Sequence, residues 1–222
     1  MTLALFDLDN TLLDGDSDFE WGQFLVRKGL VDGPSYTAKN LEFYEQYKAG
    51  TLNIYEFAAF SLTPLSQQDD ATLNQLHAEF MATVIQPKMS QKAIDLVSRH
   101  KDQGHTLMII TATNSFVTRP IAHAFGIEHL IATEPKRVNG RYTNQVEGIA
   151  SFQGGKVTRL NQWLESQTES LAGSYFYSDS HNDLPLLEMV DHPIVVNPDP
   201  KLMAVAKAKQ WPIMDLHDRG LD

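Results

Sequence analysis

The sequence predicts an α/β fold: a doubly wound, Rossmann-like, three-layer parallel sheet with an inserted helical unit. Two observations predict it. Short, uniformly apolar runs alternate with helical patterns along most of the chain, and one long stretch near the N-terminus has helical patterns only. Strands that alternate with helices are typical of a parallel sheet covered on both faces. A chain of 222 residues is long enough for such a domain with an insertion.

The predicted strands are apolar throughout and lack the alternation of half-exposed strands, which indicates burial on both faces. They cover residues 3–6, 106–110, 130–132, 174–177 and 193–196. Three helices are predicted from apolar residues at helical spacing. They cover residues 91–103, 115–125 and 156–165. The first two are followed by Gly104 and Gly126, and glycine commonly ends a helix.

Residues 15–85 interrupt the alternation, because they contain helical patterns and many aromatic residues but no convincing strand. We therefore expect a core domain of residues 1–14 and 86–222 and a helical domain of residues 15–85. Within the core, the pair Asn139-Gly140 predicts a β-hairpin, since both residues accept the positive φ angles of a tight turn.

Composition narrows the possible functions. The net charge is −10 and the isoelectric point is about 5.2, so nucleic acid is not expected as a partner. The chain has no cysteine, which excludes disulfides, thiol nucleophiles and zinc–thiolate sites. No apolar run approaches the roughly 18 residues that cross a bilayer, so no membrane association is expected. Asp7 interrupts the N-terminal apolar stretch too early for a signal peptide, and a cytoplasmic location is expected.

Polar residues of matching kind follow several predicted strands. Asp7 and Asp9 come directly after the first strand, Thr111 follows the second, and Asp179 and Asp183 follow the strand at 174–177. Ligands collect at the carboxyl edge of an open α/β sheet. In addition, Lys156 follows Gly154-Gly155 and opens a helix. Carboxylates, a hydroxyl, an amine and helix N-termini together suit a metal ion with a phosphate group.

These residues form four ordered motifs that resemble those of the haloacid dehalogenase superfamily. Asp7-x-Asp9-x-Thr11 matches the first motif, Thr111 the second, Lys156 the third, and Asp179-x-x-x-Asp183 the fourth. Each motif alone has low specificity, whereas all four in order are specific. The resemblance covers the chain outside the insertion, and the insertion lies where this superfamily carries its C1 cap.

The resemblance implies a role for each motif residue. Asp7 would attack phosphorus, and Asp9 would protonate the leaving oxygen and then activate water. Mg²⁺ would be held by the carboxylates of Asp7 and Asp179 and the backbone carbonyl of Asp9. Asp183 would hold a metal-bound water or Lys156. The phosphate would be held by Lys156, the Thr111 hydroxyl and the Ala112 amide.

Asp9 also distinguishes chemistries within the superfamily. The resemblance implies that dehalogenases lack this acid, because a halide leaves without a proton, and that P-type pumps carry threonine there. An aspartate at this position therefore points to a phosphatase or a phosphomutase acting on a small phosphomonoester. A receiver-type phospho-switch also has an acidic pocket with threonine and lysine, but it is shorter and lacks a cap.

Further motifs resemble the phosphoserine-phosphatase branch and, within it, a subgroup often assigned as histidinol-phosphatase. Asn182 would reach the phosphate or the substrate. Asp16 occupies a position compatible with holding an ammonium group, and Trp21 is a candidate substrate contact. The acidic, aromatic-rich cap has Arg27 as its only arginine and favours histidinol phosphate over phosphoserine. Asp16 and Asp18 are equally compatible with solvated surface positions. The oligomeric state stays open.

Overall fold

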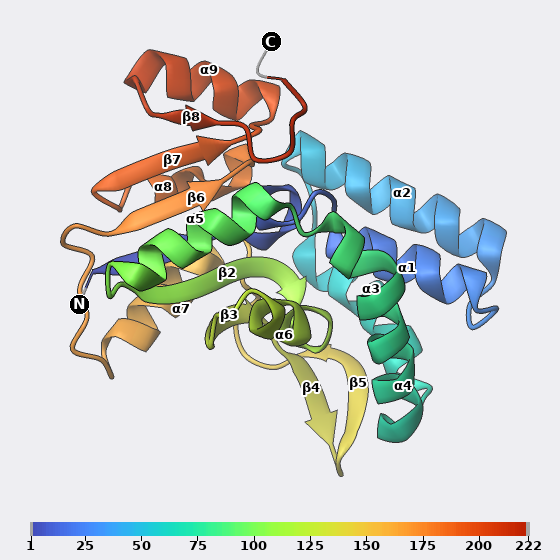
Figure 1. Cartoon of the computed structure of the whole chain (residues 1–222). Helices are drawn as coiled ribbons and strands as arrows, with labels where there is room; N and C mark the ends of the chain where they lie inside the picture. Colours follow the sequence, from blue (N-terminus) through green and yellow to red (C-terminus); the bar gives the residue numbers. More distant parts are fainter. Residues whose placement is uncertain (1, 221–222) are drawn as a thin grey trace.

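The computed structural model describes residues 2–220. Its centre is a six-stranded sheet in the order β3-β2-β1-β6-β7-β8, with every neighbouring pair parallel (Figure 1). The strands are β1 Leu3–Phe6, β2 Thr106–Asn114, β3 His129–Thr133, β6 Tyr175–Ser178, β7 His192–Val196 and β8 Ile213–Met214. The strand order reverses on either side of β1. The carboxyl end of β1 is therefore the switch point at which α/β sheets bind ligands.

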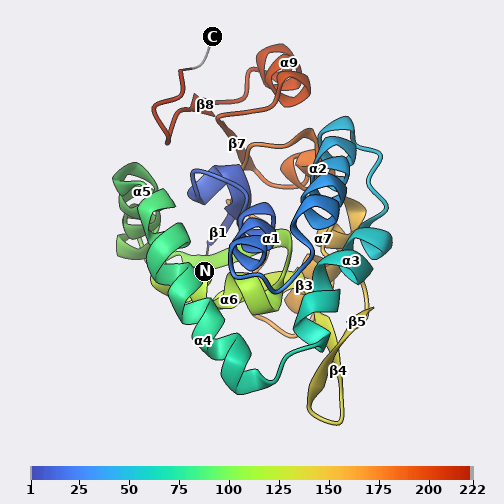
Figure 2. The same cartoon turned by 90° about the vertical axis from the view of Figure 1, so that its right-hand side faces the viewer.

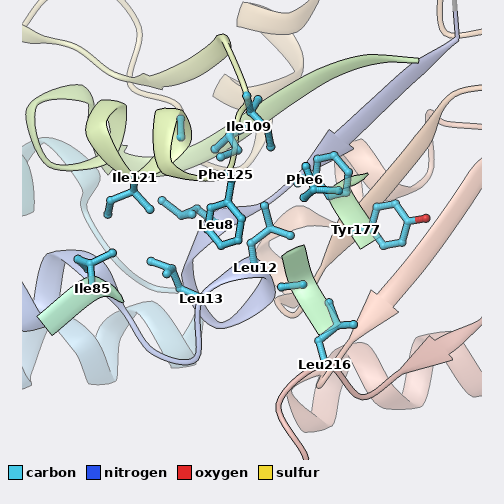
Figure 3. Close-up of a cluster of buried hydrophobic side chains, with 14 of the residues drawn as sticks. Phe6, Leu8, Leu12, Leu13, Ile85, Ile109, Ile121, Phe125, Tyr177 and Leu216 are labelled. Carbon is cyan, nitrogen blue, oxygen red and sulfur yellow. The ribbon is translucent and has the colours of Figure 1, made fainter. Parts of the chain in front are cut away.

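Helices cover both faces of the sheet. They are α5 Gln91–Asp102, α6 Ser115–Ala124, α7 Gly154–Leu164, α8 Leu184–Leu187 and α9 Pro200–Lys209. Alternate residues of β1 point to opposite faces, so Phe6 packs in the cluster with α5 and α6, whereas Leu5 packs in the cluster with α7, α8 and α9. The result is the predicted three-layer architecture. Figure 3 shows part of the first cluster.

Between β1 and α5 the chain forms four α-helices: α1 Ser17–Arg27, α2 Gly33–Ala49, α3 Ile54–Ser66 and α4 Asp70–Phe80. Side chains at their N-termini stabilise three of them, because Asp16, Asn53 and Asp69 accept backbone hydrogen bonds from the first turns of α1, α3 and α4. The arrowheads of β2, β6 and β7 point toward the side on which α1–α4 lie (Figure 1), and Figure 2 turns these helices to the viewer. The division into core and cap at residues 14/15 and 85/86 stays a prediction.

The β-hairpin is confirmed. Strands β4 Pro135–Val138 and β5 Arg141–Val146 are antiparallel, and φ is +50° at Asn139 and +80° at Gly140. Both angles match the tight hairpin turn that this residue pair favours. Tyr142 and Val146 of β5 pack against an apolar cluster that includes Leu62 of α3. The hairpin therefore supports one side of the cap.

The structure differs from the sequence prediction at several places. β2 was expected to end at residue 110 but continues to Asn114, and its pairing with β3 shifts register between Ile110 and Asn114. The helices α8 and α9 and the two-residue edge strand β8 were not predicted. α8 and β8 are too short to form a periodic apolar pattern, and α9 buries only Leu202 and Ala206. Among residues 2–220, no helix is both long and apolar enough to cross a bilayer.

Candidate active site

The segment after β1 forms a tight loop held in place by the core. Asn10 has φ +57°, and its amide donates to the carbonyl of Gly15 at 2.9 Å. Leu8, Leu12 and Leu13 of this loop are fully buried in the core cluster (Figure 3). Since these leucines are anchored, the polar residues between them are held at the carboxyl end of β1.

Asp7 lies at the start of this loop and pairs with a buried lysine. Asp7 is 4% exposed, and its Oδ1 lies 2.8 Å from Nζ of Lys156, which itself is 2% exposed. Both carboxylate oxygens of Asp183 also lie 2.8 Å from this Nζ, and the Ser178 hydroxyl donates to Asp183 at 2.7 Å. Three chain segments predicted from the motifs therefore meet in one buried network.

Thr11 connects this network to Asp179. Its Oγ1 lies 3.3 Å from Oδ2 of Asp7 and 3.2 Å from Oδ1 of Asp179, and it accepts the backbone N–H of Asp179 at 3.0 Å. A hydroxyl carries one proton and donates to one of the two carboxylates at a time. The carboxylates of Asp7 and Asp179 both lie within hydrogen-bond distance of the Thr11 hydroxyl. They are therefore close to each other, as two ligands of one metal ion must be.

The charge in this network is unbalanced. Burial raises the pKa of Asp7 to about 7 although Lys156 lowers it, and Asp183 and Asp9 add to the rise. Burial, together with Asp7 and Asp183, raises the pKa of Asp179 well above its usual range. Burial lowers the pKa of Lys156, but Asp183 and Asp7 more than offset this, so that its pKa is raised overall. A divalent cation would supply the missing positive charge.

The oxygen atoms present fit Mg²⁺. Among residues 2–220, no three His, Asp or Glu side chains form a metal-binding group by themselves. The predicted ligand set needs only two carboxylates, from Asp7 and Asp179, and takes its third protein oxygen from the backbone carbonyl of Asp9. Mg²⁺ is commonly bound by one or two carboxylates and completes its shell with water and substrate oxygens.

Asp9 lies at the contact between the core and the cap. Its Oδ1 accepts the backbone N–H of Ser17 in α1 at 2.6 Å, and its Oδ2 accepts from Thr113 Oγ1 at 2.8 Å. Burial and the nearby Asp16 raise the pKa of Asp9 to about 6, against the lowering effect of Ser17 and Thr113. A carboxyl group that titrates near neutrality can both donate and accept a proton, as general acid–base chemistry requires.

A cleft lies between Asp7 and the cap helices. Its core wall contains Asp7, Asp9, Asn10, Thr111, Ala112 and Thr113, and its cap wall contains Asp16, Asp18, Phe19, Asn40, Phe43, Tyr44, Tyr47, Leu52, Ile54 and Phe57. The predicted phosphate-binding residues Thr111 and Ala112 therefore border the same space as Asp7. None of these lining residues, all within the described part of the chain, is lysine, arginine or histidine.

The structure decides between the two interpretations of the cap acids. Asp18 is only 6% exposed and Asp16 is half-buried, and both line the cleft, so they are not solvated surface acids. Burial raises the pKa of each carboxyl group. Asp16 has a second role, because its side chain accepts the Phe19 N–H at 2.9 Å and caps α1.

Two predicted substrate contacts lie elsewhere. Trp21 is 1% exposed and packs against Phe24, Phe80 and Phe116, so it belongs to the core and does not line the cleft. Asn182 donates to the carbonyl of Tyr47 at the end of α2 at 3.0 Å and also does not line the cleft. Asn182 therefore joins the core to the cap.

Sequence reasoning missed several cleft residues. Asn40 of α2 is 3% exposed, and Tyr44 and Tyr47 lie one and two turns further along the same helix. These positions follow the helical repeat, which places residues 40, 44 and 47 on one face of α2. The repeat was visible in the sequence, but nothing in it indicated which face meets the cleft.

The loop before α7 depends on a glycine. A Cβ at Gly155 would lie 2.1 Å from the backbone carbonyl oxygen of Ala150, whereas a Cβ at Gly154 would meet nothing within 4 Å. Backbone cannot yield as a flexible side chain does, so we expect Gly155→Ala to lower the free energy of unfolding by about 1–3 kcal/mol. Gly154→Ala is the matched control and should stay within about 0.5 kcal/mol. Urea denaturation measures both, and equal values would contradict the packing described for this loop.

The chain is similar to several known proteins. A family model described as haloacid dehalogenase-like hydrolase matches residues 4–188. A protein named histidinol-phosphatase from Neisseria meningitidis serogroup C (strain 8013) is 45% identical over 217 residues, which covers 96% of this chain and 98% of that protein. A crystal structure from Bordetella pertussis Tohama I, described as a protein of unknown function, is 47% identical with a TM-score of 0.91 and covers 97% of this chain and 100% of that one.

A phosphoserine phosphatase solved with bound substrate has a TM-score of 0.70 at 15% identity, covering 96% of this chain and 92% of that one. At this identity the likeness concerns the fold alone. The motif residues gathered around Asp7 and the family match over most of the chain lead to the same conclusion. The chain belongs to the haloacid dehalogenase-like hydrolase family and is a phosphatase of that family.

Proposed function

We propose that this protein is a Mg²⁺-dependent phosphatase that hydrolyses histidinol phosphate, or a closely similar amine phosphate, through an aspartyl-phosphate on Asp7. One observation carries the proposal: Asp7 lines an acidic cleft while Lys156, Thr11 and Asp179 surround its carboxylate. Proposed ligands of the metal are Asp7, Asp179 and the Asp9 carbonyl. When bound, Mg²⁺ would neutralise charge on the phosphate and on the carboxylates.

In the first half-reaction, an oxygen of Asp7 forms a bond to phosphorus as the bond from phosphorus to the ester oxygen breaks. Protonated Asp9 gives its proton to the leaving alkoxide, which departs as the alcohol. Lys156 and the Thr111 hydroxyl, with the Ala112 amide, hold the non-bridging phosphate oxygens. Asp183 orients Lys156, whose amine it contacts through both oxygens.

In the second half-reaction, ionised Asp9 accepts a proton from water as that water attacks phosphorus. The bond between phosphorus and the Asp7 oxygen breaks, and inorganic phosphate and the free carboxylate are restored. Asp9 is protonated again and ready for the next ester. The contact between Asp9 and the Ser17 amide of α1 supports a coupling between cap position and this proton transfer.

The composition of the cleft supports a cationic substrate. Asp16 and Asp18 add negative charge to the cap wall, and no described lining residue is cationic. A phosphoserine carboxylate would enter this cleft without a partner, and a buried unpaired charge is strongly disfavoured. An ammonium group would find a carboxylate beside aromatic faces. The name of the relative from Neisseria meningitidis points to the same substrate.

A phosphate-release screen tests this proposal. With Mg²⁺, we expect histidinol phosphate to give the highest kcat/KM in a panel with phosphoserine, sugar phosphates and nucleotides. Chelation by EDTA should abolish release, and Mg²⁺ should restore it. Preference for phosphoserine would refute the proposed substrate but not the phosphatase, and phosphate transfer to a sugar acceptor in place of water would indicate a phosphomutase. A cytoplasmic location and the absence of nucleic-acid and membrane partners stay predictions from the sequence.

A further inference from the structure

Asp18 is a buried carboxylate whose surroundings do not balance its charge. It lies in the first turn of α1, is 6% exposed and lines the cleft. Its Oδ1 accepts one hydrogen bond, from Nδ2 of Asn114 at 3.2 Å. Its other oxygen has no hydrogen bond within residues 2–220, and no Lys, Arg or His side chain of this described range forms a salt bridge with it. This oxygen must therefore take its hydrogen bond from water or from a ligand in the cleft.

The position of this carboxylate is fixed. Asn114 ends β2, and its Oδ1 accepts the Val117 N–H at 3.2 Å as the N-cap of α6, so its amide can present only Nδ2 to Asp18. On the cap side, Asn40 donates to the Phe19 carbonyl at 3.3 Å and holds α2 against α1. A rigid carboxylate with one free oxygen is a preorganised acceptor for a substrate N–H group.

Asp16 and Asp18 have different neighbours in the cleft. Asp16 caps α1 by accepting the Phe19 N–H, whereas Asp18 contacts Asn114 at the end of β2. Asp18 lies beside Ile54 and Phe57 in the lining of the cleft and of a small hollow next to it. The apolar side chains can pack against the faces of a flat ring while the Asp18 carboxylate accepts a hydrogen bond from an N–H group of that ring.

We propose that Asp18 determines specificity by accepting a hydrogen bond from the imidazole ring of the substrate. This inference rests on the proposed function and gives a role to one carboxylate of the cap wall. A free imidazole titrates near pH 6.5, so the ring can bind Asp18 as a neutral N–H donor or as a cation.

The test compares Asp18→Asn with Glu20→Gln as the matched control. Glu20 belongs to the same helix but pairs with Lys88 at 3.1 Å and does not line the cleft. Two substrates are used: histidinol phosphate, and 2-aminoethyl phosphate, which has the amine but no ring. For Asp18→Asn, kcat/KM should fall about 10- to 100-fold more for histidinol phosphate than for 2-aminoethyl phosphate, as expected for loss of a charge-assisted hydrogen bond. Glu20→Gln should lower neither selectively.

An equal loss on both substrates would show that Asp18 only holds α1 against Asn114, and this would overturn the inference. A second assay avoids dependence on the proposed substrate. Histamine, which carries the ring and the amine without phosphate, should inhibit hydrolysis of p-nitrophenyl phosphate by the wild-type protein, and the inhibition constant should rise at least about tenfold in Asp18→Asn. An unchanged inhibition constant overturns the inference. Weak turnover of histidinol phosphate by the wild type would refute the proposed substrate alone.

Discussion

Replacing Asp7 by asparagine is expected to lower phosphatase activity by at least about a thousandfold, because the amide cannot form the acyl-phosphate. The fold should survive. Asparagine has nearly the shape of aspartate, and Lys156 keeps its contacts with Asp183. Phosphate release with p-nitrophenyl phosphate and Mg²⁺ measures the activity.

The stability of this variant separates loss of chemistry from loss of structure. The pKa of Asp7 is raised from 3.8 to about 7 in the folded protein, so the free energy of unfolding falls as pH rises between these values, and the full loss is present above pH 7. Without metal at pH 8, Asp7→Asn should therefore unfold at the same temperature as the wild type or at a higher one. Normal turnover by this variant would remove Asp7 from the mechanism, and a much lower melting temperature would show that its carboxylate is structural.

Removal of Lys156 should have the largest effect on stability. Its amine is 2% exposed and contacts Asp7 and Asp183. Lys156→Met keeps most of the volume but leaves two buried carboxylates without their cation, and breaking a buried pair typically costs about 3–5 kcal/mol. Activity should also fall, because the phosphate loses a charged donor. Urea denaturation without metal measures the free energy of unfolding.

Lys209→Met serves as the control. Lys209 pairs with Glu188 on the surface, where both side chains are about half exposed, and an exposed pair contributes about 0–1 kcal/mol. The double variant Lys156→Met/Asp183→Asn should recover part of the lost stability. In this variant the Asp183 charge is removed together with the lysine that paired with it, so that only Asp7 is left without a cation. If Lys156→Met proved no more harmful than Lys209→Met, the buried network described around Asp7 would be wrong.

Much of the site was predictable because its residues follow strands whose apolar character is clear. β1 was predicted as residues 3–6 and has those bounds, and the parallel sheet brings the residues after β1 and β6 to one edge. Asp7, Asp179 and Asp183 are close for this reason. The acidic pocket alone is also compatible with a receiver-type phospho-switch. Membership of the hydrolase family and the presence of the four cap helices exclude that alternative.

The remaining features depend on contacts that sequence spacing does not encode. Trp21 is buried by Phe80 and Phe116, which lie far along the chain, and an aromatic residue in a cap helix gives no sign of which side it faces. The last part of β2 contains Thr111 and Thr113, whose hydroxyls contact Asp9. Because these residues are polar, the sequence has no apolar pattern there that would predict a strand. The amide of Asn182 is occupied by the cap backbone.

The central claim is that a phosphoryl group is transferred to Asp7, and an acid quench during turnover tests it most directly. The Asp9→Asn variant is suited to this, because p-nitrophenolate leaves without a proton while hydrolysis of the intermediate still needs the missing base. Peptide mapping by mass spectrometry after the quench should locate the phosphoryl group on Asp7. A phosphoryl group on another residue, or phosphate release with no phosphorylated protein at any time, would contradict the account.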